Sequence, residues 1–273
     1  MAFTVPANAD LLARAQAGDA RALELLLAEH APRIARFAAH MCRHAADADD
    51  VVQETLISAS RALRSFRGQS ALPTWLFAIA RSHCRRQRRK ARSGSGGAVD
   101  VHEPAAVRDL QLTDRAEPAD QALQGRELAA EVAGAMAQLA PAYREVLLLR
   151  DVEGLTAPEV GVLLGTPVAT VKTRLHRARM QVRDRLAPLL EASGSEPSGC
   201  PDIGRIYSRH LEGDIGPATC ARMQQHLQDC PYCARRCATL RAAVASCAAL
   251  KGDHIPVRLQ SIIRHALDHA GAP

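Results

Sequence analysis

Large aromatic side chains are scarce in this chain, which has one Trp, three Tyr and four Phe among 273 residues. So few rings beside abundant Ala and Leu favour small helical bundles over one large sheet core. No apolar run approaches the roughly 18 residues of a membrane-spanning helix, and polar residues follow Met1 to Pro6 without the apolar core of a signal peptide. We therefore expect an all-α protein of two or three modules, located in the cytoplasm and without a membrane partner.

The charge of the chain is basic and unevenly spread. The net charge is +6 and the isoelectric point is about 9.1. Seven of the twelve residues from Arg81 to Arg92 are Arg or Lys, whereas residues 99–127 are mainly acidic and polar. A cationic cluster of this density favours a polyanionic partner such as a nucleic acid.

Changes in helical periodicity and runs of small polar residues divide the chain into three modules. Amphipathic helical runs cover 10–17, 20–41 and 47–66, and a further helix begins near Pro73. The predicted segments are a helical module at 8–92, a flexible acidic linker at 93–118, a second module at 119–190, a short linker at 191–199 and a third module at 200–273.

Residues 155–179 have the pattern of a helix-turn-helix. Thr156 can cap a first helix, Glu159 lies three residues later as in a capping box, and Gly165 can end that helix. Three apolar residues of the second helix have the spacing of an inward face: Val171, Leu175 and Ala178.

The opposite face of this second helix is polar and cationic, which suits the major groove of DNA. Its residues are Thr170, Lys172, Thr173, Arg174, His176 and Arg177. An ordinary helical hairpin with a solvated basic face has the same local pattern, so the upstream segments decide between the two interpretations.

Two groups of segments together resemble the extracytoplasmic-function (ECF) sigma factors. Residues 47–56, 66–70 and 74–81 resemble their region 2, and residues 139–149 with the helix-turn-helix resemble their region 4. Both groups occur in the family's order within residues 8–190. The resemblance implies a protein that catalyses no reaction, binds bacterial core RNA polymerase through its β′ and β subunits, and recognises the −10 and −35 elements of promoter DNA.

By resemblance, a helix with an acidic and amide row would dock on the coiled coil of the β′ subunit. The row consists of Asp49, Asp50, Gln53 and Glu54. Such a row on a rigid helix can steer toward a basic partner. The plain alternative is a solvated helix N-terminus.

The resemblance also implies contacts with the −10 element. The loop at 67–72 would capture an unstacked base through Arg67, Gln69 and Ser70. Trp75 and Phe77 either stack on bases or belong to the core. Leu56 and Ala59 stand where relatives often carry aromatic residues, which bears on local packing.

Two further sets of residues are predicted to bind DNA. Contacts to phosphate are expected from the dense cluster of Arg85, Arg86, Arg88, Arg89 and Lys90. Contacts to the −35 element are expected from Lys172, Thr173, Arg174, His176 and Arg177. Arg177 is the candidate base reader, because its planar fork can contact guanine O6 and N7 together, while Lys172 and Arg174 suit phosphate.

Cysteine is concentrated in the third module, which holds six of the eight cysteines. In a cytoplasmic chain this favours metal or redox chemistry over structural disulfides. The pattern H-x3-C-x2-C at 226–233 can supply three corners of a tetrahedral site. The segment resembles the zinc-binding anti-sigma fold, which implies the ligand set Cys200, His226, Cys230 and Cys233. His210 and Cys220 are weaker candidates.

Cys237 and Cys247 exceed a single zinc site and are candidates for additional ligands. Their spacing is similar to that of ECF sigma factors whose cysteine-rich domain responds to copper, cadmium or zinc, and thiolates suit such metals. The sequence is compatible with structural zinc and with a sensed metal such as Cu or Cd. The third module is interpreted as a regulatory domain acting in cis, and a separate anti-sigma factor is a further candidate partner.

Two other classes of protein compete with this interpretation. A conventional helix-turn-helix regulator with a metal-sensing domain would bind duplex DNA alone and would have no use for the row from Asp49 to Glu54. A thiol oxidoreductase could use Cys230 and Cys233 as a C-x-x-C pair, but it needs a strand–helix context that the sequence does not show.

Overall fold

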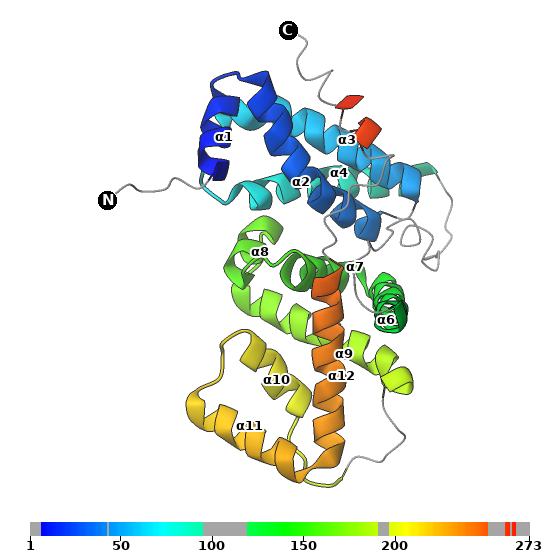
Figure 1. Cartoon of the computed structure of the whole chain (residues 1–273). Coiled ribbons are helices and arrows are strands. Elements are labelled where there is room, and N and C mark those ends of the chain that lie inside the picture. Colours follow the sequence, from blue (N-terminus) through cyan, green and yellow to red (C-terminus); the bar gives the residue numbers. More distant parts are fainter. Residues whose placement is uncertain are drawn as a thin grey trace. The chain divides into compact units, whose positions relative to one another are not determined.

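Helices form the regular structure of the chain, and no strand occurs in the residues that this computed structural model describes (Figure 1). The described residues are 7–42, 44–94, 119–190, 197–250, 260–262 and 264–265. The all-α prediction is confirmed. Residues 95–118 and 191–196, which hold most of the two predicted linkers, lie outside the described residues. The helices divide into two units, one with α1–α4 and the other with α6–α12.

The first unit is a helical bundle. Its elements are α1 (Ala7–Gln16), α2 (Ala20–Met41), α3 (Ala45–Ala62), the 3₁₀ turn η1 (Leu63–Ser65) and α4 (Leu72–Gly94). Asp19 caps α2, because its carboxylate accepts two backbone N–H bonds of the first turn. The rings of Phe37 and Phe77 meet at 5.5 Å between centroids. Leu56 and Ala59 are fully buried on α3, so the residues at these positions are part of the core.

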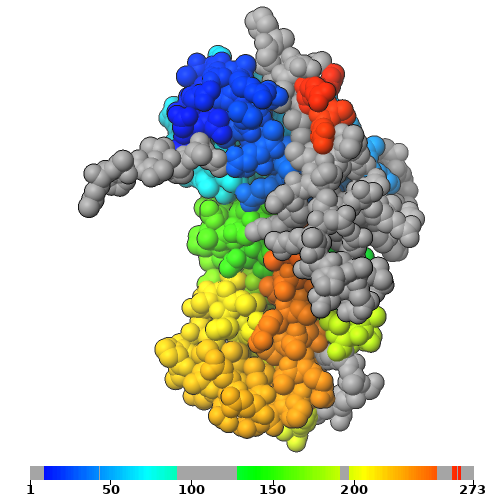
Figure 2. Space-filling model, viewed as in Figure 1, coloured from blue at the N-terminus to red at the C-terminus, as the bar shows by residue number. Residues whose placement is uncertain are grey.

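The second unit combines the second and third predicted modules. Its elements are α6 (Ala119–Ala137), α7 (Pro141–Leu147), the π-helical turn η2 (Leu148–Val152), α8 (Ala157–Leu164), α9 (Val168–Leu190), α10 (Ile203–Leu211), α11 (Pro217–Asp229) and α12 (Pro231–Ala249). Helix α12 packs against α9, α6 and η2, and α10 packs against α9. Figure 2 shows α10–α12, in yellow and orange, adjoining the green part of the same unit. The two predicted modules therefore form one packed unit.

A buried arginine connects α6 to α7. Arg144 is 1% exposed, and its guanidinium donates to the carbonyl oxygens of Met136 at 3.0 Å, Ala137 at 2.5 Å and Leu139 at 2.9 Å. These carbonyls lie at the end of α6, where helical hydrogen bonds run out. The guanidinium therefore replaces missing backbone donors and joins two helices at one point.

We expect the substitution Arg144→Met to lower the free energy of unfolding of this unit by about 2–4 kcal/mol, because it removes the side-chain donor to the carbonyl oxygens of Ala137 and Leu139, while that of Met136 keeps the backbone N–H of Leu139. The measurement is hydrogen exchange of the α7 amides, compared with the exposed control Arg222→Met on α11. Equal protection of α7 in the two variants would contradict the capping role of Arg144.

Candidate functional site

The candidate metal centre lies where α11 passes into α12. Cys230 has an extended backbone, ends α11 and immediately precedes α12. Pro231 follows at the first helical position, which proline favours because its missing N–H has no helical partner there. His226 lies one helical turn before Cys230, and Cys233 lies in the first turn of α12. This local geometry directs three candidate ligands toward one junction.

Four side chains meet at this junction: Cys200, His226, Cys230 and Cys233. Their ligand atoms all lie within 4.8 Å of one another, and the Sγ atoms of Cys200 and Cys230 are 3.8 Å apart. Donors bonded to one tetrahedral ion at about 2.0–2.3 Å would be separated by roughly 3.3–3.8 Å. The Nε2 atom of His226 is buried and has no hydrogen-bond partner among the described residues. Because buried polar atoms are normally paired, this nitrogen and its three sulfur neighbours fit a metal ion.

The two thiols at the start of α12 differ in acidity. Burial raises the pKa of Cys233 to about 12, and the nearby sulfurs of Cys200 and Cys230 act in the same direction. The backbone N–H of Cys233 donates to the sulfur of Cys230 and holds the pKa of Cys230 below its usual value.

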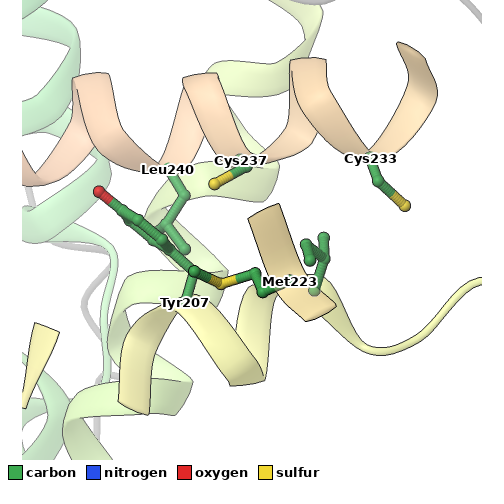
Figure 3. Packing of buried hydrophobic residues seen from close by; sticks show 6 residues of the cluster. Tyr207, Met223, Cys233, Cys237 and Leu240 are labelled. Atoms are coloured by element: carbon green, nitrogen blue, oxygen red, sulfur yellow. The ribbon is translucent and has the colours of Figure 1, made fainter. Parts of the chain in front are cut away.

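The other candidate ligands lie apart from this group. The buried core below the junction consists of Ile203, Tyr207, Met223, Cys233, Cys237 and Leu240 (Figure 3). Cys237 lies one turn beyond Cys233 on α12, within that core, and Cys247 is buried near the other end of the same helix. Sγ of Cys220 lies 4.0 Å from Nδ1 of His210. The structure does not bring Cys237, Cys247, His210 or Cys220 into the group of four.

The helix-turn-helix forms as predicted. Oγ1 of Thr156 accepts the backbone N–H of Glu159, and the Glu159 carboxylate accepts the backbone N–H of Thr156 at 2.7 Å, which completes the capping box. Gly165 ends α8 in the left-handed region, at a φ of 62° that favours glycine. The residues predicted to face inward from α9 are fully buried: Val171, Leu175 and Ala178.

Part of the outward face of α9 is open. Thr173 and Arg177 are exposed, and Arg174 is half-buried. Nη1 of Arg177 donates to the hydroxyl of Tyr143 on α7 at 3.3 Å. This weak contact holds the guanidinium at the surface, where its donors can turn to another partner.

The rest of that face is covered by the C-terminal helices. Nζ of Lys172 lies 2.5 Å from Oδ1 of Asp214, which follows α10. His176 is half-buried, and its Nδ1 has no hydrogen-bond partner among the described residues. Burial lowers the pKa of His176, against a smaller opposing effect of Asp202. Two of the predicted DNA contacts are therefore engaged or covered by the protein's own chain.

The acidic row on α3 borders α4. Asp50 and Glu54 are exposed, while Asp49 and Gln53 are half-buried. Nη2 of Arg86 lies 3.7 Å from Oε2 of Glu54. A cation predicted to bind phosphate thus lies beside the row predicted to bind polymerase.

The loop predicted to contact the −10 element lies between η1 and α4. Of its predicted contacts, Arg67 and Gln69 are exposed and Ser70 is half-buried. The ring of Trp75 is half-buried and packs 5.1 Å from that of Phe66. Phe77 is 1% exposed. Core packing is thus the alternative that the structure supports for Phe77, because a buried ring cannot stack on a base.

The basic cluster of α4 divides into two kinds of side chain. Arg85, Arg89 and Lys90 are exposed. Arg88 is half-buried and donates to the carbonyl oxygen of Met41 at 2.8 Å, so it joins α4 to the end of α2. The exposed residues are accessible to a partner, whereas Arg88 also has a structural role.

Comparison with known families gives three matches along the chain. Sigma-70 region 2 matches residues 26–94, and Sigma-70 region 4 matches residues 129–182. A zinc-finger family matches residues 200–234, which contain all four residues of the metal centre. The three matches follow one another along the chain in this order.

Whole proteins with similar sequences are sigma factors. The RNA polymerase sigma-H factor of Pseudomonas aeruginosa is 34% identical over 195 residues, which cover 69% of this chain and 98% of that protein. The ECF RNA polymerase sigma-E factor of Escherichia coli K12 is 31% identical over 66% of this chain and 94% of its own length. The chain belongs to the ECF sigma factors. A solved structure, CnrH in complex with the cytosolic domain of CnrY, has a TM-score of 0.47 and 27% identity, and covers 66% of this chain and 97% of that one.

This ECF sigma factor binds core RNA polymerase and directs initiation at specific promoters, with a C-terminal regulatory domain of the zinc-finger type. The zinc-finger match begins at residue 200, beyond the region 4 match, which ends at residue 182. None of the described helices is both long enough and apolar enough to span a bilayer.

A cluster of charged residues in the sigma factor's second unit was not predicted from the sequence. Glu212, in the turn after α10, accepts from Nη2 of Arg179 at 3.0 Å and from Nε of Arg150 at 3.1 Å. Arg179 also forms a bidentate pair with Asp151, at 2.8 and 2.6 Å. An acidic helix break at 211–217 was visible in the sequence, but its partners are up to 62 residues away.

We expect substitution of two neighbouring cysteines of α12 to have different effects on the metal content of the protein. Cys233→Ser should lose the bound metal, because a hydroxyl replaces a buried ligand sulfur, whereas Cys237→Ser should retain about one ion per chain. The measurement is elemental analysis of anaerobically purified proteins. Equal metal content in the two variants would contradict the assignment of the four ligands.

Proposed function

We propose that three separate surfaces of this sigma factor make its contacts with polymerase and with the two promoter elements. The acidic row on α3 binds the β′ coiled coil, the loop at 67–72 with the exposed cations of α4 binds the −10 region, and the outward face of α9 binds the −35 element. The observation that supports this most directly is the open, cationic side of α9, which includes Thr173 and Arg177, on a correctly capped helix-turn-helix. The protein acts by binding, in the cytoplasm, where polymerase and promoters are found.

The metal is proposed to be zinc in a structural role. Three sulfurs and one imidazole form a complete tetrahedral set, which is typical of closed structural zinc sites and leaves no position for a reacting ligand. Bound zinc would hold the segment before α10 to the junction of α11 and α12. Cys237 and Cys247, buried outside this set, act in this proposal as small core residues.

The polymerase surface is proposed from exposure and charge. Asp50 and Glu54 are exposed, and the ion pair of Glu54 with Arg86 joins side chains that are each more than half exposed. Such a pair contributes little to stability. The row can therefore exchange this contact for a basic partner without loss of the fold.

Reversal of charge in Asp50→Lys/Glu54→Lys is expected to weaken binding of core polymerase by about tenfold or more, because complementary charge becomes like charge. The control is Asp10→Lys/Glu24→Lys, which reverses two solvent-accessible acidic residues of the same unit. Binding is measured by titration of labelled core enzyme, with circular dichroism to verify the fold. If both double variants bind as tightly as the wild type, α3 is not the docking surface.

The base-reading role is proposed for Arg177 and a phosphate role for Arg174. Both lie on the accessible side of α9, but Lys172 is already paired with Asp214. Arg174 is therefore the cleaner comparison with Arg177, because its substitution does not also break the contact with the C-terminal domain.

Arg177→Ala in holoenzyme is expected to cost about 1–3 kcal/mol at one −35 position and to relax the preference there. Arg174→Ala should weaken all sequences alike and reduce the dependence of binding on salt. The measurement is selection of bound sequences from a duplex library at two salt concentrations. An identical, sequence-independent loss in both variants would show that Arg177 contacts phosphate alone.

A further inference from the structure

We propose that the turn between α10 and α11 is an acidic clamp that competes with promoter DNA for helix α9. The clamp consists of Glu212 and Asp214, which contact α9 through Arg179 and Lys172. The inference rests on the proposed assignment of α9 to the −35 element, and it specifies how the C-terminal domain regulates that element's recognition.

One arm of the clamp, Asp214, is paired with Lys172, a cation predicted to contact DNA. The Asp214 carboxylate lies 2.5 Å from the Lys172 ammonium, and both side chains are about one-third exposed. A carboxylate at this distance takes the place that a phosphate oxygen would take in a protein–DNA contact. Because an ion pair with this exposure is weak, DNA phosphate could displace Asp214 if nothing else held the turn in place.

The other arm holds the turn in place. The Glu212 side chain is 5% exposed and bridges Arg179, which is 2% exposed, to Arg150. Burial alone would favour the neutral form of Arg179, but Asp151 and Glu212 outweigh it and raise the pKa of that guanidinium. A buried charge that loses its partner is costly, so Glu212 anchors the turn much more firmly than Asp214 does.

Close packing of α10 on α9 extends the coverage. A Cβ atom at Gly204 would lie 2.7 Å from Sδ of Met180, so glycine permits the two helices to approach here. Nearby, His176 is half-buried and experiences the charges of Asp202 and Arg205. A recognition helix must enter the major groove along this face. The docked α10 and its acidic turn therefore exclude DNA from part of α9 while Arg177 stays exposed.

The first test removes the clamp charges in the full-length protein. Glu212→Gln/Asp214→Asn keeps side-chain size but removes both carboxylates. The control is Asp184→Asn/Asp229→Asn, which removes the same charge at two exposed positions that do not bridge α9 and the turn. Affinity is measured by fluorescence anisotropy with a duplex pool of random sequence. We expect the clamp variant to bind at least about fivefold more tightly than the control, because a larger fraction of molecules is open.

The second test opens the same contact by steric means. Gly204→Leu places a side chain against Met180 and Arg183 without a change in charge. Metal content and circular dichroism verify that the domain remains folded. Tighter DNA binding by this variant and by the clamp variant supports the proposal. Equal affinity of the clamp variant and its charge-matched control, or no gain in Gly204→Leu, would overturn it, because both changes release the same surface.

Failure of the clamp is distinct from failure of the proposed function. With core polymerase, all the variants should still enrich a −35 sequence from a duplex library, and Arg177→Ala should lose preference at one position of it. If no variant enriches any sequence, α9 is not the promoter reader. If all variants enrich it equally well and bind equally tightly, promoter recognition stands and the clamp is wrong.

Discussion

The arrangement of the second unit depends on the buried guanidinium of Arg179, which needs carboxylate partners. Arg179 is 2% exposed and must be matched by carboxylates, since an unpaired buried charge is among the most destabilising defects that a fold can carry. One carboxylate, Asp151, comes from the π-helical turn η2, and the other, Glu212, comes from the C-terminal domain. Arg150 of the same turn completes a set of two cations and two anions. Ion pairing therefore joins the turn after α10 to both α9 and η2.

The metal centre supports this arrangement from the other end of the C-terminal domain. Helices α10–α12 share a core of six buried residues, a small number for three helices, and small domains often need a metal to supplement the hydrophobic effect. The four ligands connect the segment before α10 with the junction of α11 and α12. From that junction α12 continues to α9, α6 and η2 (Figure 1). The same region of the chain thus carries metal ligands and much of the contact with region 4.

In the first unit, one pair of helices carries both the surface proposed to bind polymerase and the surface proposed to bind the −10 region. Packing of α3 against α4 places the acidic row next to the cationic cluster, and Arg86 contacts Glu54 across the boundary. Both surfaces are solvated, and the contact between them is weak enough to exchange for polymerase or DNA. The core below them is filled by residues such as Leu56 and Phe77.

Local patterns in the sequence were sufficient for the elements whose physics is local. The capping box of Thr156 and Glu159, the left-handed Gly165 and the buried row of Val171, Leu175 and Ala178 depend on neighbours within a turn or two. Three of the four side chains that meet at the junction lie within eight residues of one another, whereas Cys200 was expected from the family resemblance. In these local elements, the groups that pair with one another lie close together in the sequence.

Tertiary structure decided which of the predicted side chains are available. Lys172, His176, Thr173 and Arg177 all have the spacing of an outward face on α9. Packing of α10 and its acidic turn partly covers Lys172 and His176, whereas Thr173 and Arg177 stay exposed. Likewise, Cys237 has a plausible ligand spacing but points into an apolar core. Partners such as Arg150 and Glu212 are 62 residues apart. Sequence periodicity determines which face of a helix a residue occupies, whereas long-range packing determines what that face meets.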